Sequence, residues 1–400
     1  MLIRIYLRPN LINPFFLIIW TTLRQADIRI LSDFFDLTQK YILLILLFFG
    51  EFMAGLILFI YRLKFYGKKN FITKRKDSKS SIQLIQGEAS IKKLDSDLKI
   101  FFLIFITSYL DFVEIVLCNS YLPKFYNLSV SIFFRFYCIL TIISSLFMHF
   151  LLKIKILKHQ YYSLIIIGIC LILIIITEFS FQKIDQLLSY GEFMLAIFYL
   201  ILIHFFLALL DCIEKYLYEY DYADQFKVLM IQGFLGVIIS PFYYIKENPL
   251  IEIKQIYNNN STGMFILFIF LLCMYSLLTG LKNIYRVTTN KLFSPVAKSL
   301  ADYIINPFYI IYYYIVKNDF SDKNGRNIYF FLINLILALI INFWGLVYNE
   351  FIILFFWGLE HETHREISKR AIVKEIVSEF DEEDDNSIKF EEEDDSSIMN

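Results

Sequence analysis

Long apolar runs separated by short polar segments follow one another along almost the whole chain. A helix needs roughly 20 mostly apolar residues to cross about 30 Å of hydrocarbon, and nine runs approach or reach that length. We therefore predict nine membrane-spanning helices in an all-α, polytopic membrane protein. They are expected at Tyr41–Ile60, Ile100–Cys118, Ser129–Leu152, Tyr162–Glu178, Glu192–Leu210, Val228–Tyr244, Met264–Leu281, Leu300–Val316 and Tyr329–Tyr348.

A shorter apolar run, Leu11–Leu23, is a tenth candidate. It has only about half to two-thirds of the length needed for a span and contains Asn13 and Pro14. Three interpretations stay open: a short or tilted helix, an interfacial segment, and part of an incomplete first helix. Arg4 and Arg8 precede it as in a signal sequence, but no A-x-A-like site follows, so we expect the segment to be retained.

The basic residues between the runs predict the topology. The segment Lys68–Lys99 contains nine Lys and Arg residues and should be cytosolic. Acceptor motifs for N-glycosylation at Asn259 and Asn260 fall in a loop predicted to be lumenal, which agrees with this assignment. Counting helices places further basic residues on the cytosolic side: Lys153, Lys155, Lys158, Lys227, Lys282, Arg286, Lys291, Arg365, Lys369 and Arg370.

Three regions follow from this pattern. Residues 1–40 form an N-terminal segment with a poor or partial first helix, and residues 41–358 form the membrane domain, with a cytosolic basic loop at 66–99. Residues 359–400 form an acidic tail. Within the tail, Phe380–Asn400 contains the near-repeat FDEEDDNSI and FEEEDDSSI, whose charge density prevents core formation, so we expect it to be disordered.

Composition narrows the function classes. Of the 400 residues, 58% are hydrophobic, and the formal net charge is −1, which disfavours nucleic acid as a partner. His361 and His364 lie in HETH, which lacks the H-E-x-x-H spacing of zinc hydrolases. The sequence has no G-x-S-x-G motif and no Gly-rich phosphate loop. We expect no enzyme activity, no cofactor and no metal site.

Charged residues inside the predicted spans are candidates for function, because each costs about 2.5–3.5 kcal/mol at the centre of a membrane helix. Glu51 lies in the middle of its span, and Asp111 and Glu114 share one face of the next helix. Arg135 lies near the start of the helix after that. We hypothesise that Glu51 or Asp111 neutralises Arg135 inside the bundle, and a purely structural ion pair is the alternative.

Two segments have a similar local order. Ser131 precedes Arg135 by four residues, and Ser294 precedes Lys298 by four residues, each ahead of a Phe/Tyr/Ile-rich helix. The first pair is predicted at the lumenal end of its helix and the second at the cytosolic end. This opposite placement is typical of an inverted-topology repeat with a solute site between its halves. Coincidence is the alternative, because S-x-x-x-[KR] is a short pattern.

Several motifs, in order along the chain, resemble the drug/metabolite transporter superfamily and, within it, F-type members of the solute carrier 35 family. FFGEF resembles the family's F-L-G-E-F motif in its second helix, and IFFRF resembles its fourth-helix segment with an arginine. Gln232 stands where the family pattern has Glu. The segments that resemble the family are Phe48–Phe52, Ile132–Phe136, Glu214–Tyr216, Gln232–Gly236, Leu292–Asp302, Val347–Glu350 and Gly358–Glu360.

The resemblance implies ten helices in two inverted halves of five, cytosolic termini and alternating access around a central cavity. It also implies a small, nucleotide-sugar-like solute and an internal membrane (Golgi, endoplasmic reticulum or endolysosomal) in preference to the plasma membrane. Fold membership alone does not select the solute.

The resulting hypothesis is a secondary transporter of a small, anionic metabolite. Arg135 and Lys298 would provide positive potential for the solute, and Ser131, Ser294 and Asp302 would contribute polar contacts. Glu51, Asp111 and Glu114 would balance charge or couple transport to protons. The alternative is a transport-inactive scaffold that binds cytosolic partners through the acidic tail or the basic loop. A homodimer is compatible with either interpretation.

Overall fold

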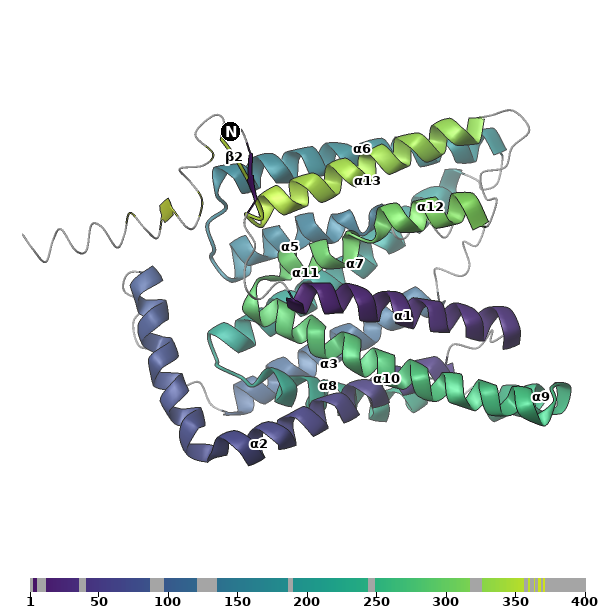
Figure 1. The fold of residues 1–400 in the computed structure, drawn as a ribbon, viewed down its shortest axis with the longest axis horizontal. Helices are drawn as coiled ribbons and strands as arrows, with labels where there is room; N and C mark the ends of the chain where they lie inside the picture. Colours follow the sequence, from purple (N-terminus) through teal and green to yellow (C-terminus); the bar gives the residue numbers. More distant parts are fainter. Residues whose placement is uncertain are drawn as a thin grey trace, which may run out of the picture.

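The computed structural model describes residues 3–5, 12–35, 41–86, 97–120, 135–185, 190–243, 249–316 and 326–355, together with residues 359, 363, 366, 367 and 370. They form a bundle of long helices with a two-stranded ribbon at one end (Figure 1). In chain order the elements are β1 (Ile3–Ile5), α1 (Ile12–Phe35), α2 (Tyr41–Gln86), α3 (Asp97–Ser120), α5 (Cys138–Leu151), α6 (Lys158–Asp185), α7 (Tyr190–Glu219), α8 (Gln225–Tyr243), α9 (Pro249–Asn259), α10 (Thr262–Leu292), α11 (Pro295–Tyr303), α12 (Asn306–Val316), α13 (Arg326–Tyr348) and β2 (Ile352–Leu354).

The outer surface of the bundle is apolar. Six helices in the described part of the chain are long and apolar enough to cross a membrane, and α5 and α8 are shorter apolar helices. Only 28% to 44% of the residues in the most apolar windows of the six are buried inside the protein. Large side chains such as Phe101, Phe150 and Ile172 therefore point outward. Because this apolar surface requires lipid rather than water, the chain is a multi-pass α-helical membrane protein.

The first helix is longer than the sequence predicted. The run Leu11–Leu23 appeared too short for a span, but α1 continues to Phe35 and has 24 residues, or about 36 Å at 1.5 Å per residue. Pro14 lies in the first turn of α1, where a helix tolerates proline because the backbone N–H has no intrahelical partner. The second half of α1 contains polar residues, so its low hydropathy did not indicate a membrane helix. One of these polar residues, Asp27, is nevertheless buried.

The predicted span Leu300–Val316 is wrong as a single helix. It is divided into α11 and α12, with turn residues Ile304 and Ile305 between them. Pro307 explains the division, since it has no N–H to bond the carbonyl of Tyr303 and its ring would clash with that carbonyl.

Three other helices depart from their predicted bounds. α2 continues to Gln86, so the predicted basic loop at 66–99 is helical over its first part, and Figure 1 shows this part turning across one end of the bundle. α10 continues to Leu292, beyond the predicted end at Leu281. α5 begins at Cys138 after a turn at Tyr137. The predicted first residues of that span, 129–134, and the acidic tail from residue 371 onward lie outside the described residues.

Both described ends of the chain lie at the same end of the bundle. β1 pairs antiparallel with β2, with Ile3 opposite Leu354 and Ile5 opposite Ile352. Helices α3, α6, α8 and α11 also begin here, and we call this end, which contains most of the predicted cytosolic loops, the basic end (left in Figure 1). α9 lies at the opposite end. The chain thus crosses the bundle an even number of times, counting α11 and α12 as one crossing.

Glycines bring α2 into close contact with α8 and α10, the helices against which it packs most extensively. A Cβ at Gly50 would overlap the carbonyl oxygen of Ser276 on α10, and a Cβ at Gly233 on α8 would overlap the backbone N of Phe52. Small residues at such contacts allow membrane helices to approach closely. The approach of α2 to α10 places Glu51, next to Gly50, inside the bundle.

This packing predicts that Gly50→Ala and Gly233→Ala destabilise the protein. The added methyl group must displace backbone atoms, and overpacking of this kind costs about 1–3 kcal/mol. Gly168→Ala, in the middle of α6, is the matched control: no atom lies within 4 Å of the place its methyl group would take, so stability should be unchanged or higher. Thermal unfolding of the purified protein in detergent measures the difference, and equal midpoints for all three variants would contradict the proposed contacts.

Candidate functional site

Three helices bring acidic and basic side chains together inside the bundle. Lys298 of α11 pairs with Asp211 of α7 at 2.9 Å between Nζ and Oδ2, and with Asp302 of α11 at 3.4 Å. Arg286 of α10 pairs with Glu214 of α7 at 3.0 Å and with Asp211 at 3.6 Å. We call these five residues the central network. Their side chains are at most 7% exposed, so the ion pairs are shielded from water.

Helical spacing explains how the network is assembled. Asp211 and Glu214 are three residues apart on α7, and Lys298 and Asp302 are four apart on α11, so each pair shares one helix face. A buried charge without a partner costs several kcal/mol. The three helices must therefore keep the register in which these side chains meet.

Two amide side chains donate hydrogen bonds to the carboxylate of Glu214. The Nδ2 amide group of Asn290 on α10 donates to Oε2 of Glu214 at 3.2 Å and to the backbone carbonyl oxygen of Asp211 at 2.9 Å. Gln232 of α8 donates to Oε1 of Glu214 at 3.1 Å. An ionised glutamate at position 232 could not donate this bond and would add another negative charge, whereas the glutamine amide is a neutral donor.

Glu51 and Asp111 join the network from the other helices. Glu51 on α2 accepts a hydrogen bond from Asn283, which precedes Arg286 by nearly one turn of α10. Asp111 on α3 lies within electrostatic range of both Glu51 and Arg286. Among the described residues, no donor reaches Oε2 of Glu51 or Oδ2 of Asp111. Two buried carboxyl oxygens therefore have free hydrogen-bonding capacity.

Glu114 lies at the margin of the same site. Its Oε1 accepts a hydrogen bond from the thiol of Cys118 at 3.2 Å, one turn along α3. It is also within electrostatic range of Lys282 and Lys298. The structure thus brings the predicted residues Glu51, Asp111, Glu114, Lys298 and Asp302 into one region of the bundle.

Arg135 lies elsewhere, and its predicted pairing with Glu51 or Asp111 is wrong. It forms an ion pair with Glu178 of α6, and both side chains are 1% exposed. Its guanidinium carbon is 5.2 Å from the ring centroid of Phe330 on α13. Arg135 precedes α5 and faces α6 and α13, whereas Glu51 faces α10. We call Arg135 and Glu178 the peripheral pair.

The two predicted serines have different outcomes. Ser294 is the N-cap of α11, where its Oγ accepts the backbone N–H of Ala297 at 3.0 Å. It therefore satisfies an otherwise unbonded N–H at the helix start, and this places Lys298 in the first turns of α11. Ser131 lies outside the described residues.

Side chains at the basic end tie helices together. Arg62 of α2 pairs with Asp224 at 2.6 Å, and Asp224 also caps α8. Lys99 of α3 pairs with Asp221 at 3.7 Å. Lys215 of α7 donates to two backbone carbonyls at the C-terminal end of α10, at 2.9 and 3.0 Å. Cations are favourable there because carbonyl groups at a helix C-terminus have no intrahelical partners.

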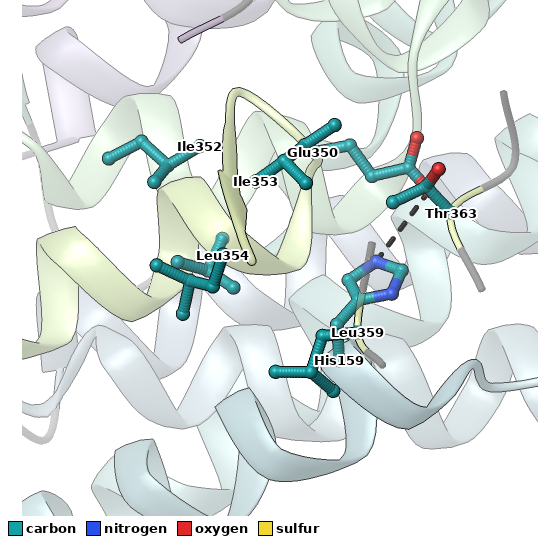
Figure 2. A pocket seen from close by; sticks show the side chains of 8 residues that line it. His159, Glu350, Ile352, Ile353, Leu354, Leu359 and Thr363 are labelled. Atoms are coloured by element: carbon teal, nitrogen blue, oxygen red, sulfur yellow. Dashed lines mark ion pairs between the residues drawn. The ribbon is translucent and has the colours of Figure 1, made fainter. Parts of the chain in front are cut away.

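A small pocket lies at the same end of the bundle. Figure 2 shows His159 and Glu350 pointing toward each other beside Thr363, with 3.6 Å between Nε2 and Oε1. The remaining lining residues are apolar: Val347, Ile352, Ile353, Leu354 and Leu359. The pocket therefore holds the segment after α13 against the start of α6 and is separate from the central network.

The predicted glycosylation acceptors lie at the end of the bundle opposite the basic end. Asn259 is exposed at the C-terminus of α9. Asn260 is half-buried and donates to the carbonyl of Ile256 at 2.9 Å. Glycosylation of either residue stays a prediction. Across the described part of the chain, no three His, Cys, Asp or Glu side chains are grouped so that they could hold a metal ion.

The sequence matches no protein-family model, and a search of curated proteins finds no match. The resemblance to the transporter family therefore rests on the short motifs alone.

Several residues of the site were missed by sequence reasoning. Arg286 was assigned to a cytosolic connection because hydropathy ended the preceding span at Leu281, yet it is buried in α10. Polar residues spaced three or four apart within an apolar helix were the available signal. The missed residues are Glu178, Asp211, Glu214, Asn283, Arg286 and Asn290.

The central network predicts that Arg286→Gln lowers stability strongly. It leaves Glu214 without its cation, and breaking a buried pair on one side costs about 3–5 kcal/mol. Lys227→Gln, an exposed change in the first turn of α8, is the control. The double variant Arg286→Met, Glu214→Leu should recover part of the loss because no charge is left unpaired. Thermal unfolding in detergent tests this, and a midpoint for Arg286→Gln equal to that of Lys227→Gln would refute it.

Proposed function

We propose that the protein is a secondary transporter that moves a small metabolite across an internal membrane by alternating access. Its two halves would be inverted repeats, with α1 to α6 in the first and α7 to α13 in the second, as in the drug/metabolite transporter superfamily. The observation that carries the proposal is the buried central network of the second half, which Glu51 of the first half reaches through its hydrogen bond with Asn283.

The pattern of helix packing supports the repeat. Most of the principal contacts are mapped onto one another when each helix of the first half is exchanged with its counterpart in the second. The exchanged helices are α1 with α7, α2 with α8, α3 with α10, α5 with α11 and α12, and α6 with α13. The contact of α1 with α10 becomes that of α7 with α3, and the contact of α2 with α10 becomes that of α8 with α3. The contacts of α2 with α8, α5 with α11 and α6 with α13 map onto themselves. Lesser contacts of α10 with α7 and α8 fall outside this pattern.

The direction of the helices agrees with an inverted arrangement. Each half has five crossings, so the second half enters the bundle from the end opposite to the first. The exchanged helices also share an interruption, at Tyr137 before α5 and at Ile304 and Ile305 between α11 and α12. Interrupted helices near the midplane are common at the solute sites of transporters built from inverted repeats.

The location of the charges supports transport rather than a purely structural role. Glu51 and Asp111 come from the first half, whereas Arg286 and Lys298 come from the second. Ionisable groups inside a membrane bundle are typical of solute and proton pathways. A movement of one half against the other would change the hydrogen bond between Asn283 and Glu51 and the separation of Asp111 from Arg286, whereas the ion pairs of Arg286 and Lys298 lie within the second half.

The charge balance determines what must accompany an anionic solute into this site. The sequence hypothesis combined Arg135 and Lys298 as two cations for an anion, but each has its own carboxylate partner. Around the central network, carboxyl groups outnumber basic groups. An anionic metabolite would therefore enter this site together with protons. We propose proton-coupled transport, with Glu51 and Asp111 as the proton-binding groups because each has an oxygen that no described donor reaches.

Transport by proteoliposomes tests this proposal. Vesicles preloaded with single members of a panel of nucleotide sugars, sugar phosphates and amino acids should exchange at least one labelled compound. An inward proton gradient should stimulate its net uptake. Glu51→Gln should retain exchange and lose the stimulation, because the variant cannot release a proton at this position.

Glu192→Gln, an exposed carboxyl at the start of α7, is the matched control and should behave as the unmodified protein. Folded protein that exchanges no member of the panel would count against transport of these classes. Proton stimulation that survives in both Glu51→Gln and Asp111→Asn would refute the assigned coupling groups.

A further inference from the structure

The two buried ion clusters lie at different depths in the bundle. Glu178 lies 20 residues after the start of α6 at the basic end, a rise of about 30 Å. Asp211 lies eight residues before the end of α7 at the same end, a rise of about 12 Å. The peripheral pair therefore lies toward the opposite end, and the central network lies toward the basic end.

Each cluster closes the bundle at its own depth. The peripheral pair joins the segment just before α5 to α6, and Phe330 of α13 packs over the Arg135 guanidinium, so first-half and second-half helices meet there. Closer to the basic end, the central network joins α7, α10 and α11. The hydrogen bond from Asn283 to Glu51 connects α2 to these helices. The side chains of both clusters are at most 7% exposed and Glu51 is 2% exposed, so in this conformation these groups are largely shielded from water.

One residue connects the two clusters. Tyr137 follows Arg135 by two residues, and its hydroxyl donates to Oδ2 of Asp302 at 3.3 Å. Asp302 is also a partner of Lys298 in the central network. The ring of Tyr137 packs edge-on against His204, with 5.1 Å between centroids. A displacement of Arg135 and the segment around it is therefore transmitted to the partner of Lys298.

We propose that the peripheral pair and the central network are the two gates of the transport cycle, coupled through Tyr137 and Asp302. The proposal rests on the transport function above and adds which groups must separate for each end to open. Breaking Arg135 from Glu178 opens the path from the opposite end. Breaking Arg286 and Lys298 from their α7 carboxylates opens the path from the basic end. The solute position lies between the gates, beside Tyr137 and Asp302.

Two native cysteines can report on the gates. Cys138 is fully buried, and its thiol donates to the carbonyl of Arg135 at 3.4 Å. Cys212 is 1% exposed and follows Asp211 directly. Two single-cysteine proteins, each with the other four cysteines replaced by Ala, would be labelled in sealed vesicles with a membrane-impermeant methanethiosulfonate reagent. Protease cleavage of the C-terminal tail establishes which end faces outward.

In Glu178→Gln, we expect the labelling rate of Cys138 to rise at least about tenfold from the side of the opposite end, with Cys212 unchanged. In Arg286→Gln, the labelling rate of Cys212 should rise by a similar factor from the side of the basic end, and the labelling rate of Cys138 should be unchanged. Glu192→Gln and Lys227→Gln, which remove exposed charges near the two ends, should change neither rate. Tyr137→Phe should uncouple the gates, so that both cysteines become reactive in the same preparation, each from its own side.

Labelling of both cysteines from both sides in Glu178→Gln would show general loosening and overturn the proposal. Unchanged labelling of Cys138 in a folded Glu178→Gln protein would overturn it as well. Should Glu178→Gln fail to fold, Phe330→Leu provides the milder loosening of the same gate and must show the same sided increase. The labelling needs no solute, so sided labelling without any exchange activity would reject the transport proposal alone.

Discussion

The structure depends on one constraint: charges inside a lipid-embedded bundle must be paired with each other. Asp211 and Glu214 on α7 are neutralised by Arg286 on α10 and Lys298 on α11, and none of the four is in contact with bulk water. Shifting any of these helices by one residue would separate the pairs and leave several buried charges uncompensated. The network thereby fixes the register of α7, α10 and α11, while lipid-facing Phe, Ile and Leu residues impose almost no register of their own.

Close packing of α2 is the second requirement of the site. The side chains of Glu51 and Asn283 are short, and they reach each other only because Gly50 lets the backbone of α2 approach α10. A larger residue at Gly50 would separate the helices and remove the link between the first half and the network. The FFGEF segment therefore combines two functions in adjacent residues. Gly50 allows the helices to approach closely, and Glu51 provides the carboxylate that reaches Asn283.

Features that depend on one strong effect, such as the insertion of long apolar runs into lipid, could be predicted from the sequence. Features that depend on which residues become neighbours in the folded protein could not. Apolar runs long enough for lipid identified most spans, and Glu51 and Asp111 were recognised because a charge inside a membrane helix is unusual. Lys298 was recognised by its spacing to Ser294, which matches that of Arg135 to Ser131. Arg286 was misassigned because hydropathy treats a paired guanidinium as it would an exposed one. The choice of Glu178 over Glu51 as the partner of Arg135 depends on which helices are neighbours, which is tertiary information. The break at Pro307 was readable locally, but the long apolar run concealed it.

Arg135 and Lys298 show why similar local sequence does not imply a shared site. Arg135 lies just before α5 and Lys298 lies in the first turn of α11, each is buried, and each has a carboxylate partner on a different helix. In the proposed inverted repeat, equivalent positions lie at opposite depths rather than side by side. Two cations placed this way cannot bind one small anion together. In the proposed transport cycle they hold the two ends of the pathway closed in turn, and a carboxylate partner at each end makes that closure reversible.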